Sequence, residues 1–242
     1  MKRCLALALF LIFNVVVIAQ SNFGVKINGG VSMITDKIYD PDLETHTNYL
    51  RPSGQVGFFY SLPVRTHEVF GVELLFTQIE SKEQIVDTFG TAYTNYPNGA
   101  TPLLSTATIS KHISYLSLPV YYGINVKKFT FNVGMQFSVR LLSSAQEVIQ
   151  DNYTNNASGF GFVLIPSTTN YNYKRLSIKD VDFGERVGII YHITNKFAIE
   201  GNYYYGFNNI YPNNHRTTIW RTQQMTLGIR YTFLTIKKKD DK

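Results

Sequence analysis

The sequence predicts an all-β fold, an eight-stranded antiparallel up-and-down transmembrane β-barrel, on the basis of three observations. Apolar and polar residues alternate over eight segments, the connectors between these segments are alternately long and short, and the composition favours a membrane barrel. Aromatic residues make up 14% of the 242 residues and charged residues only 17%, whereas charged residues are about 25% of an ordinary soluble domain. The length suits one domain, because all-β barrels of about 200–250 residues commonly do not divide.

The closing segment, residues 220–233, shows the alternation clearly. Its apolar positions are Met225, Leu227, Ile229, Tyr231 and Phe233, and its other positions from Gln224 onward are Thr226, Gly228, Arg230 and Thr232. Side chains of a strand point alternately to its two faces, so one face of this segment is apolar and the other polar. The ending in Tyr231 and Phe233 is typical of the sorting signal of outer-membrane barrels.

Seven further segments are predicted as strands. They are residues 22–34, 55–62, 70–77, 109–124, 129–141, 176–192 and 197–210. Long loops are predicted over 35–52, 87–108, 143–174 and 211–218, and short connectors around Thr66, Lys127 and Asn195. Outer-membrane barrels have short periplasmic turns and longer outer loops. The even number of strands therefore places both chain ends on the periplasmic side.

The N-terminus predicts export. Lys2 and Arg3 precede an apolar run over residues 5–18, and Val17, Ile18 and Ala19 form a small-residue cleavage motif, the pattern of a secretory signal peptide. We therefore expect a signal peptide at 1–19, an outer-membrane β-barrel domain at 20–233 and a short charged tail at 234–242. The single cysteine, Cys4, would be removed with the signal peptide, so we expect no disulfide and no lipid anchor.

Two other classes of protein are disfavoured. No apolar run reaches the about 20 residues of a membrane-spanning helix. The net charge of +6 is not concentrated on any segment except residues 237–239, which Asp240 and Asp241 follow at once. We expect this run to be a solvated tail, and we expect no nucleic-acid partner.

Charged residues also occur in mid-strand, on the faces opposite the apolar ones. They are Lys26, Glu73, Arg140, Asp182, Arg186, Glu200 and Arg230. Such charges are costly in a dry apolar barrel of the soluble, ligand-binding kind, but they can pair in a narrow polar lumen. Eight strands leave an interior only just wide enough for side chains. We therefore predict a charge network that plugs the lumen, with a gated or ion-selective pore as the alternative.

Glu185 breaks the pattern, because strict alternation with Phe183 and Val187 points it toward lipid. A carboxylate there costs free energy. We predict a β-bulge near Gly184 that turns Glu185 inward.

The predicted loop at 143–174 contains an apolar run, and its apolar side chains are candidates for contact with a partner. These are Phe160, Phe162, Val163, Leu164 and Ile165. An extension of a strand beyond the membrane is the favoured interpretation, and a binding surface is the alternative.

The histidines do not predict a catalytic or metal site. His46, His67, His112, His192 and His215 have no metal-ligand spacing and no nucleophile motif beside them. Only His112, with a carboxylate such as Asp87 or Asp151, could form a catalytic pair at the barrel rim. We expect no enzymatic activity, no cofactor and no metal.

Three short motifs resemble one family. They are the first-strand pattern over residues 23–30, the segment 115–120 and the closing segment 227–233. Together they resemble the eight-stranded outer-membrane barrels of Bacteroidetes-type bacteria known as PorT-like, one of which is linked to protein secretion and gliding. The resemblance implies contact with outer-membrane lipid, with the barrel-assembly machinery and with other envelope or secretion proteins. We therefore predict a structural or partner-binding role in the cell envelope, with a narrow channel for ions or small solutes as the alternative and a rim-located enzyme as a third.

Overall fold

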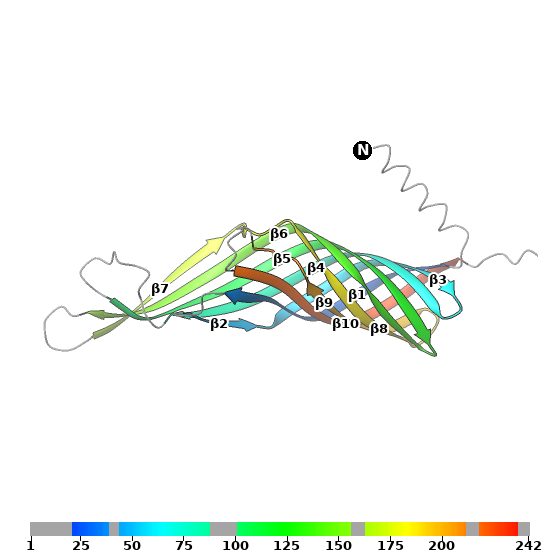
Figure 1. Ribbon diagram of the computed structural model, residues 1–242, viewed down its shortest axis with the longest axis horizontal. Coiled ribbons are helices and arrows are strands. Elements are labelled where there is room, and N and C mark those ends of the chain that lie inside the picture. Colours follow the sequence, from blue (N-terminus) through cyan, green and yellow to red (C-terminus); the bar gives the residue numbers. More distant parts are fainter. Residues whose placement is uncertain (1–20, 39–43, 88–100, 156–162, 212–217, 237–242) are drawn as a thin grey trace, which may run out of the picture.

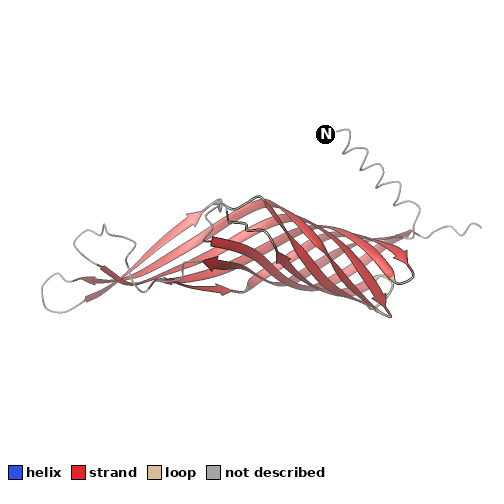
Figure 2. Ribbon diagram, viewed as in Figure 1, coloured by secondary structure: helices blue, strands red, loops and turns tan. Residues whose placement is uncertain are grey.

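The computed structural model describes residues 21–38, 44–87, 101–155, 163–211 and 218–236. Within these residues every regular element is a strand (Figure 2). The strands are β1 (Ser21–Ile38), β2 (Glu44–Tyr49), β3 (Arg51–Arg65), β4 (Glu68–Asp87), β5 (Thr101–Val126), β6 (Phe129–Asn155), β7 (Val163–Tyr173), β8 (Val181–His192), β9 (Phe197–Gly206) and β10 (Thr218–Ile236). No helix in this part of the chain is long and apolar enough to cross a membrane.

Eight of the strands close into a ring. Beginning at β1, the hydrogen-bonded order is β1, β3, β4, β5, β6, β8, β9 and β10, and β10 pairs with β1 again. All of these pairs are antiparallel. The ring confirms the predicted eight-stranded up-and-down barrel. The other two strands extend the sheet outside the ring, β2 beside β4 and β7 beside β6.

The short turns gather at one end of the elongated molecule (Figure 1). They join β3 to β4, β5 to β6 and β8 to β9, as predicted. Lys127 takes a positive φ of 54° in the β5–β6 turn, a conformation that tight hairpin turns commonly require. The amide of Asn125 donates to the carbonyl of His67 at 2.7 Å, which ties neighbouring turns together.

The opposite end differs from the prediction. Three expected loops, 35–52, 87–108 and 143–174, contain strand. β1 runs to Ile38, β2 spans Glu44–Tyr49, β5 begins at Thr101, β6 runs to Asn155 and β7 follows at Val163. β5 and β6 are 26 and 27 residues long, whereas about 9–11 residues cross the hydrocarbon core. Beyond the membrane neither face of a strand meets lipid, so the ladder continues without an apolar alternation in the sequence.

Two predicted strands start later or end earlier than expected. Leu176 to Asp180 lie in a loop before β8, and residues 207–210 follow the end of β9. The amide of Lys179 donates to the carbonyl of Ile210 at 2.9 Å, and the amide of Ile210 donates to the carbonyl of Trp220 at 3.0 Å. These bonds hold both segments at the outer mouth of the barrel.

The two faces of the barrel wall are chemically opposite. On β10, Met225, Leu227 and Ile229 are exposed, while Gln224 and Arg230 are buried, as the alternation predicted. The same contrast holds around the ring, where Val133 and Val56 are at least half exposed. The apolar face therefore points to lipid, and the polar face fills the lumen.

Candidate functional site

The centre of the lumen holds five charged side chains from five strands. Lys26 lies on β1, Glu73 on β4, Arg186 on β8, Glu200 on β9 and Arg230 on β10, and none is more than 4% exposed. Each is at an even step from its strand's other lumen-facing residues, which is why the alternation places it inside.

These five side chains form one ion-pair cluster. Lys26 contacts both carboxylates, with Nζ 2.9 Å from Glu73 Oε2. Arg186 Nη1 lies 2.6 Å from Glu73 Oε2. Arg230 Nη1 lies 3.1 Å from Glu200 Oε2 and 3.5 Å from Glu73 Oε1. Three cations thus share two carboxylates, and the cluster carries a formal charge of +1.

Neutral side chains complete the cluster. Asn28 Nδ2 donates to Glu200 Oε1 at 2.6 Å, and the Arg230 guanidinium lies 3.9 Å from the centre of the Phe59 ring. Arg230 Nη2 also donates to the hydroxyl of Tyr121 at 3.1 Å. β10 and β5 are on opposite sides of the eight-stranded ring. The side chains of Arg230 and Tyr121 together therefore span the lumen.

Two of the predicted network residues lie elsewhere, nearer the outer mouth. Asp182 accepts a hydrogen bond from the Thr222 hydroxyl. Arg140 pairs with Asp180 and donates to the carbonyl of Leu176 at 2.9 Å. Arg140 therefore fastens the loop before β8 rather than joining the central cluster.

An apolar layer lies at this outer level of the lumen. Its buried members are Ile34, Ile79, Ile113, Tyr115, Ile178 and Ile210, with Leu176 and Trp220 packed against them. Ile178 and Ile210 come from the two non-strand segments that cross the mouth. Both residues lie in segments that were predicted as strands, so this apolar layer was not predicted.

A second buried ion pair was also missed. Lys111 Nζ lies 2.6 Å from Glu83 Oε2, and His46 Nδ1 lies 2.9 Å from Glu83 Oε1. Lys111 also stands 3.6 Å from the centre of the Trp220 ring, a cation–π contact. The alternation of strand side chains could have predicted this pair. Glu83 lies ten residues after Glu73 on β4, and Lys111 lies ten residues before Tyr121 on β5. An even separation places both residues on the lumen face.

The prediction for Glu185 was wrong. The β6–β8 ladder runs unbroken through Gly184 and Gln136, Glu185 and Met135, and Arg186 and Gly134, so there is no bulge. Glu185 is exposed on the outer face, between Phe183 and Val187. A bulge would leave backbone groups unpaired in hydrocarbon, where each costs several kcal/mol. One exposed carboxylate costs less.

The residues of the predicted sorting signal lie near the end of β10 that is beside the short turns. The rings of Phe233 and Phe23 make an edge contact at 5.1 Å, and those of Tyr231 and Phe197 lie 4.8 Å apart. We expected the barrel to end at Phe233. β10 instead continues to Ile236, paired with Ser21, past an irregularity between Phe23 and Gly24.

The other candidate residues are only partly placed. Phe160 and Phe162 lie outside the described residues, as do the predicted signal peptide and residues 237–242. Val163, Leu164 and Ile165 begin β7, paired with Thr154 and its neighbours on β6.

His112, for which Asp87 or Asp151 was proposed as a partner at the rim, pairs with Glu80. His112 Nδ1 lies 3.3 Å from Glu80 Oε1 on the exposed outer face. Among the residues that the structure describes, no three His, Cys, Asp or Glu side chains are grouped to hold a metal ion.

Comparisons with known proteins identify the family. Residues 18–211 match the model of the family described as outer membrane protein beta-barrel domain. The chain belongs to this family. Its location in the outer membrane follows from that membership. No curated protein sequence matches the chain significantly.

Solved structures align with most of the chain at low sequence identity and low TM-score. Neisserial surface protein A is 11% identical, with a TM-score of 0.38, 88% of this chain covered and 99% of that one. OprG from Pseudomonas aeruginosa is 10% identical, with a TM-score of 0.40 and coverages of 89% and 96%. Ail of Yersinia pestis is 9% identical, with a TM-score of 0.38 and coverages of 89% and 99%.

Proposed function

We propose that this outer-membrane barrel is a closed scaffold that binds a partner in the cell envelope, as predicted for a PorT-like protein. The observation that carries this proposal is the obstructed lumen. The central ion cluster joins opposite walls, and the apolar layer with Ile178 and Ile210 lies above it. A solute would have to break ion pairs in a low-dielectric interior and displace buried side chains.

The binding surface is the part of the sheet that extends beyond the membrane. β4, β5 and β6 continue past the apolar band, and β2 and β7 widen them to a five-stranded sheet. Polar pairs such as Tyr173 Oη with Glu147 Oε2 at 2.8 Å, and Tyr49 Oη with Gln84 Oε1 at 2.8 Å, stiffen its edges. We call this five-stranded extension the platform. A rigid surface of this kind suits recognition of another envelope or secretion protein.

Partner capture tests the binding role. The tagged chain, exported by its predicted signal peptide in a strain lacking the native copy, is crosslinked and purified from outer membranes. We expect a specific partner with the intact chain, and loss of that partner when the β6–β7 hairpin is replaced by a short turn. The barrel-assembly machinery should appear with both, because it handles every barrel. Equal capture by both chains would contradict a role for the platform.

A narrow channel is the second candidate, and one observation favours it. Several lumen-facing polar atoms, including Gln136 Oε1, Thr77 Oγ1 and Gln224 Nε2, have no hydrogen-bond partner among the described residues. A file of water and ions could use such atoms.

Planar-bilayer conductance separates the two candidates. We expect the wild-type barrel to be silent. Discrete conductance steps that disappear when Arg230 or Arg140 is neutralised would establish the channel and overturn the closed scaffold. Val133→Ala, on the lipid face, serves as the matched control.

A further inference from the structure

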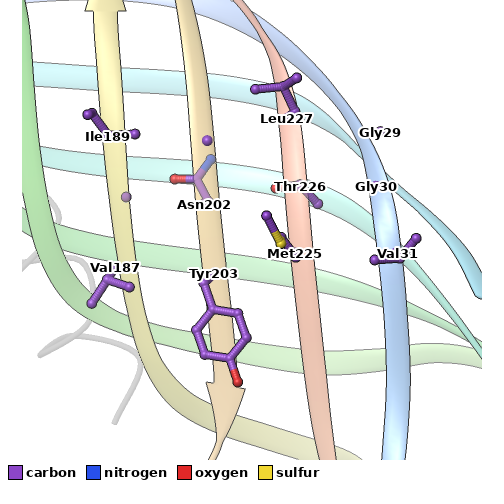
Figure 3. A pocket seen from close by; sticks show the side chains of 12 residues that line it. Gly29, Gly30, Val31, Val187, Ile189, Asn202, Tyr203, Met225, Thr226 and Leu227 are labelled. Atoms are coloured by element: carbon purple, nitrogen blue, oxygen red, sulfur yellow. The ribbon is translucent and has the colours of Figure 1, made fainter. Parts of the chain in front are cut away.

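The lipid-facing wall formed by β8, β9, β10 and β1 contains a hollow. Gly201 and Gly29 face outward there, and the hollow, of about 700 Å³, is bordered by Val187, Ile189 and Tyr203 (Figure 3). The two glycines leave the surface open, since a Cβ at Gly29 would meet nothing within 4 Å and one at Gly201 nothing nearer than 3.7 Å.

A ridge on the same wall lines this hollow and separates its two glycines. Met225 and Leu227 on β10 are 65% and 66% exposed. Leu227 is in register with Gly201 on β9 and with Gly29 on β1. The wall therefore presents two projecting apolar side chains next to a hollow whose lining is also apolar.

Polar groups flank the hollow on both sides. Glu185 is exposed on β8, in register with Tyr205 on β9, which is in register with Gln223 on β10. Gln223 accepts a hydrogen bond from the Tyr203 hydroxyl at 3.1 Å, and Arg221 donates to the Tyr205 hydroxyl at 2.9 Å. The acid is thus on the β8 side, and the amide and the cation are on the β10 side.

We propose that this wall is the contact surface between two copies of the chain within the membrane. Two copies in one membrane share their orientation, so a dimer axis lies along the membrane normal, and its interface uses the same patch twice. An axis between β9 and β10 sets the Leu227 ridge of each copy against the Gly201 hollow of the other. The same rotation turns the Glu185 side of each copy toward the side on which the other carries Gln223 and Arg221.

A lipid acyl chain is the competing occupant of the hollow. It would fill the apolar space but would offer Glu185 no hydrogen-bond donor. A second copy supplies donors and apolar contacts together, so the observations favour it.

Cysteine crosslinking in intact outer membranes tests the dimer. A Cys4→Ser background removes the only cysteine, and Leu227→Cys places a thiol on the ridge. Leu118→Cys is the matched control, because Leu118 is exposed on β5, on the opposite side of the ring. We expect Leu227→Cys to give a crosslinked dimer, and co-expressed Leu227→Cys and Gly201→Cys chains with different tags to give the mixed dimer. Crosslinking of Leu227→Cys no higher than that of Leu118→Cys would overturn the proposal.

Two further substitutions test the contact itself. Gly201→Leu fills the hollow with a side chain that the monomer can accommodate, and Glu185→Leu removes the acid. Both are expected to fold, checked by the gel mobility of the unheated barrel, and to lower the Leu227→Cys crosslinked yield. Glu185→Leu should lower it by about tenfold, the effect of a lost charged hydrogen bond. Gly201→Leu should lower it at least as much, because the Leu227 side chain of the other copy then has no space to enter. An acyl chain in the hollow predicts no change in yield with either substitution, and that result would also overturn the proposal.

Discussion

Glu73 is the residue on which the central cluster depends most. It contacts Lys26, Arg186 and Arg230, whereas Lys26 can be lost without leaving either carboxylate unpaired. The wild-type cluster has three cations and two carboxylates, a charge of +1. Glu73→Gln raises this to +2, because three cations then share Glu200 alone. Lys26→Met lowers it to zero, with two arginines on two carboxylates.

The two substitutions therefore differ in cost. Breaking a buried ion pair from one side costs about 3–5 kcal/mol, and we expect that loss of unfolding free energy for Glu73→Gln. We expect less than about 2 kcal/mol for Lys26→Met, because an apolar replacement that leaves the remaining charges balanced is often tolerated. The double variant restores the cluster charge to +1. Its loss of unfolding free energy should therefore be smaller than the sum of the losses of the two single variants.

Urea unfolding of the barrel in phospholipid vesicles measures these differences. The single tryptophan, Trp220, lies beside the apolar layer at the outer mouth and reports opening of the lumen. The midpoint shift at constant slope gives the change in unfolding free energy. Equal losses for the two single variants, or a larger loss for Lys26→Met, would refute the charge-balance reasoning.

Three other predictions concern single substitutions. Glu185→Leu should raise the unfolding free energy of the monomer in detergent by about 1–2 kcal/mol, because it removes a carboxylate from the apolar band; urea titration measures this, and a loss of stability would contradict the exposed position. Gly71→Ala should cost about 1–3 kcal/mol, since its Cβ would overlap the Tyr121 ring, whereas Gly29→Ala should be neutral; equal midpoints would contradict the close packing. Phe233→Ala should reduce the amount of folded barrel in outer membranes, measured by heat-modifiable gel mobility, and an unchanged amount would show that the signal does not depend on this ring.

The sequence predicted the fold because its strongest pattern has one physical cause. Inside a membrane, lipid faces one side of every strand and a packed lumen the other, so residues such as Leu227 and Arg230 must alternate. The number of strands, their faces and the short turns all follow from that constraint. Beyond the membrane the constraint ends, and for this reason the outer ends of β5 and β6 were mistaken for loops.

The same limit explains what was missed in the lumen. Alternation gives the face of a residue but not its height, because height depends on strand tilt and on the stagger between strands. Arg140 and Asp182 were therefore grouped with Lys26, although they lie at a different level. Glu83 was overlooked because its stretch of β4 has no apolar alternation to mark it.

The central cluster and the platform are connected through the strands they share. Glu73 on β4 holds Arg186 and Arg230, and Tyr121 on β5 accepts a hydrogen bond from Arg230. β4 and β5 are the strands that continue into the platform, and the apolar layer with Ile79 and Ile113 lies between the cluster and the platform. A barrel built to conduct would need these cross-lumen bonds to open, and each opening would free Glu73 and Tyr121 on the two strands that lead to the platform. A barrel built to hold a binding surface gains rigidity from the same bonds, which is why the closed scaffold accounts for the two features together.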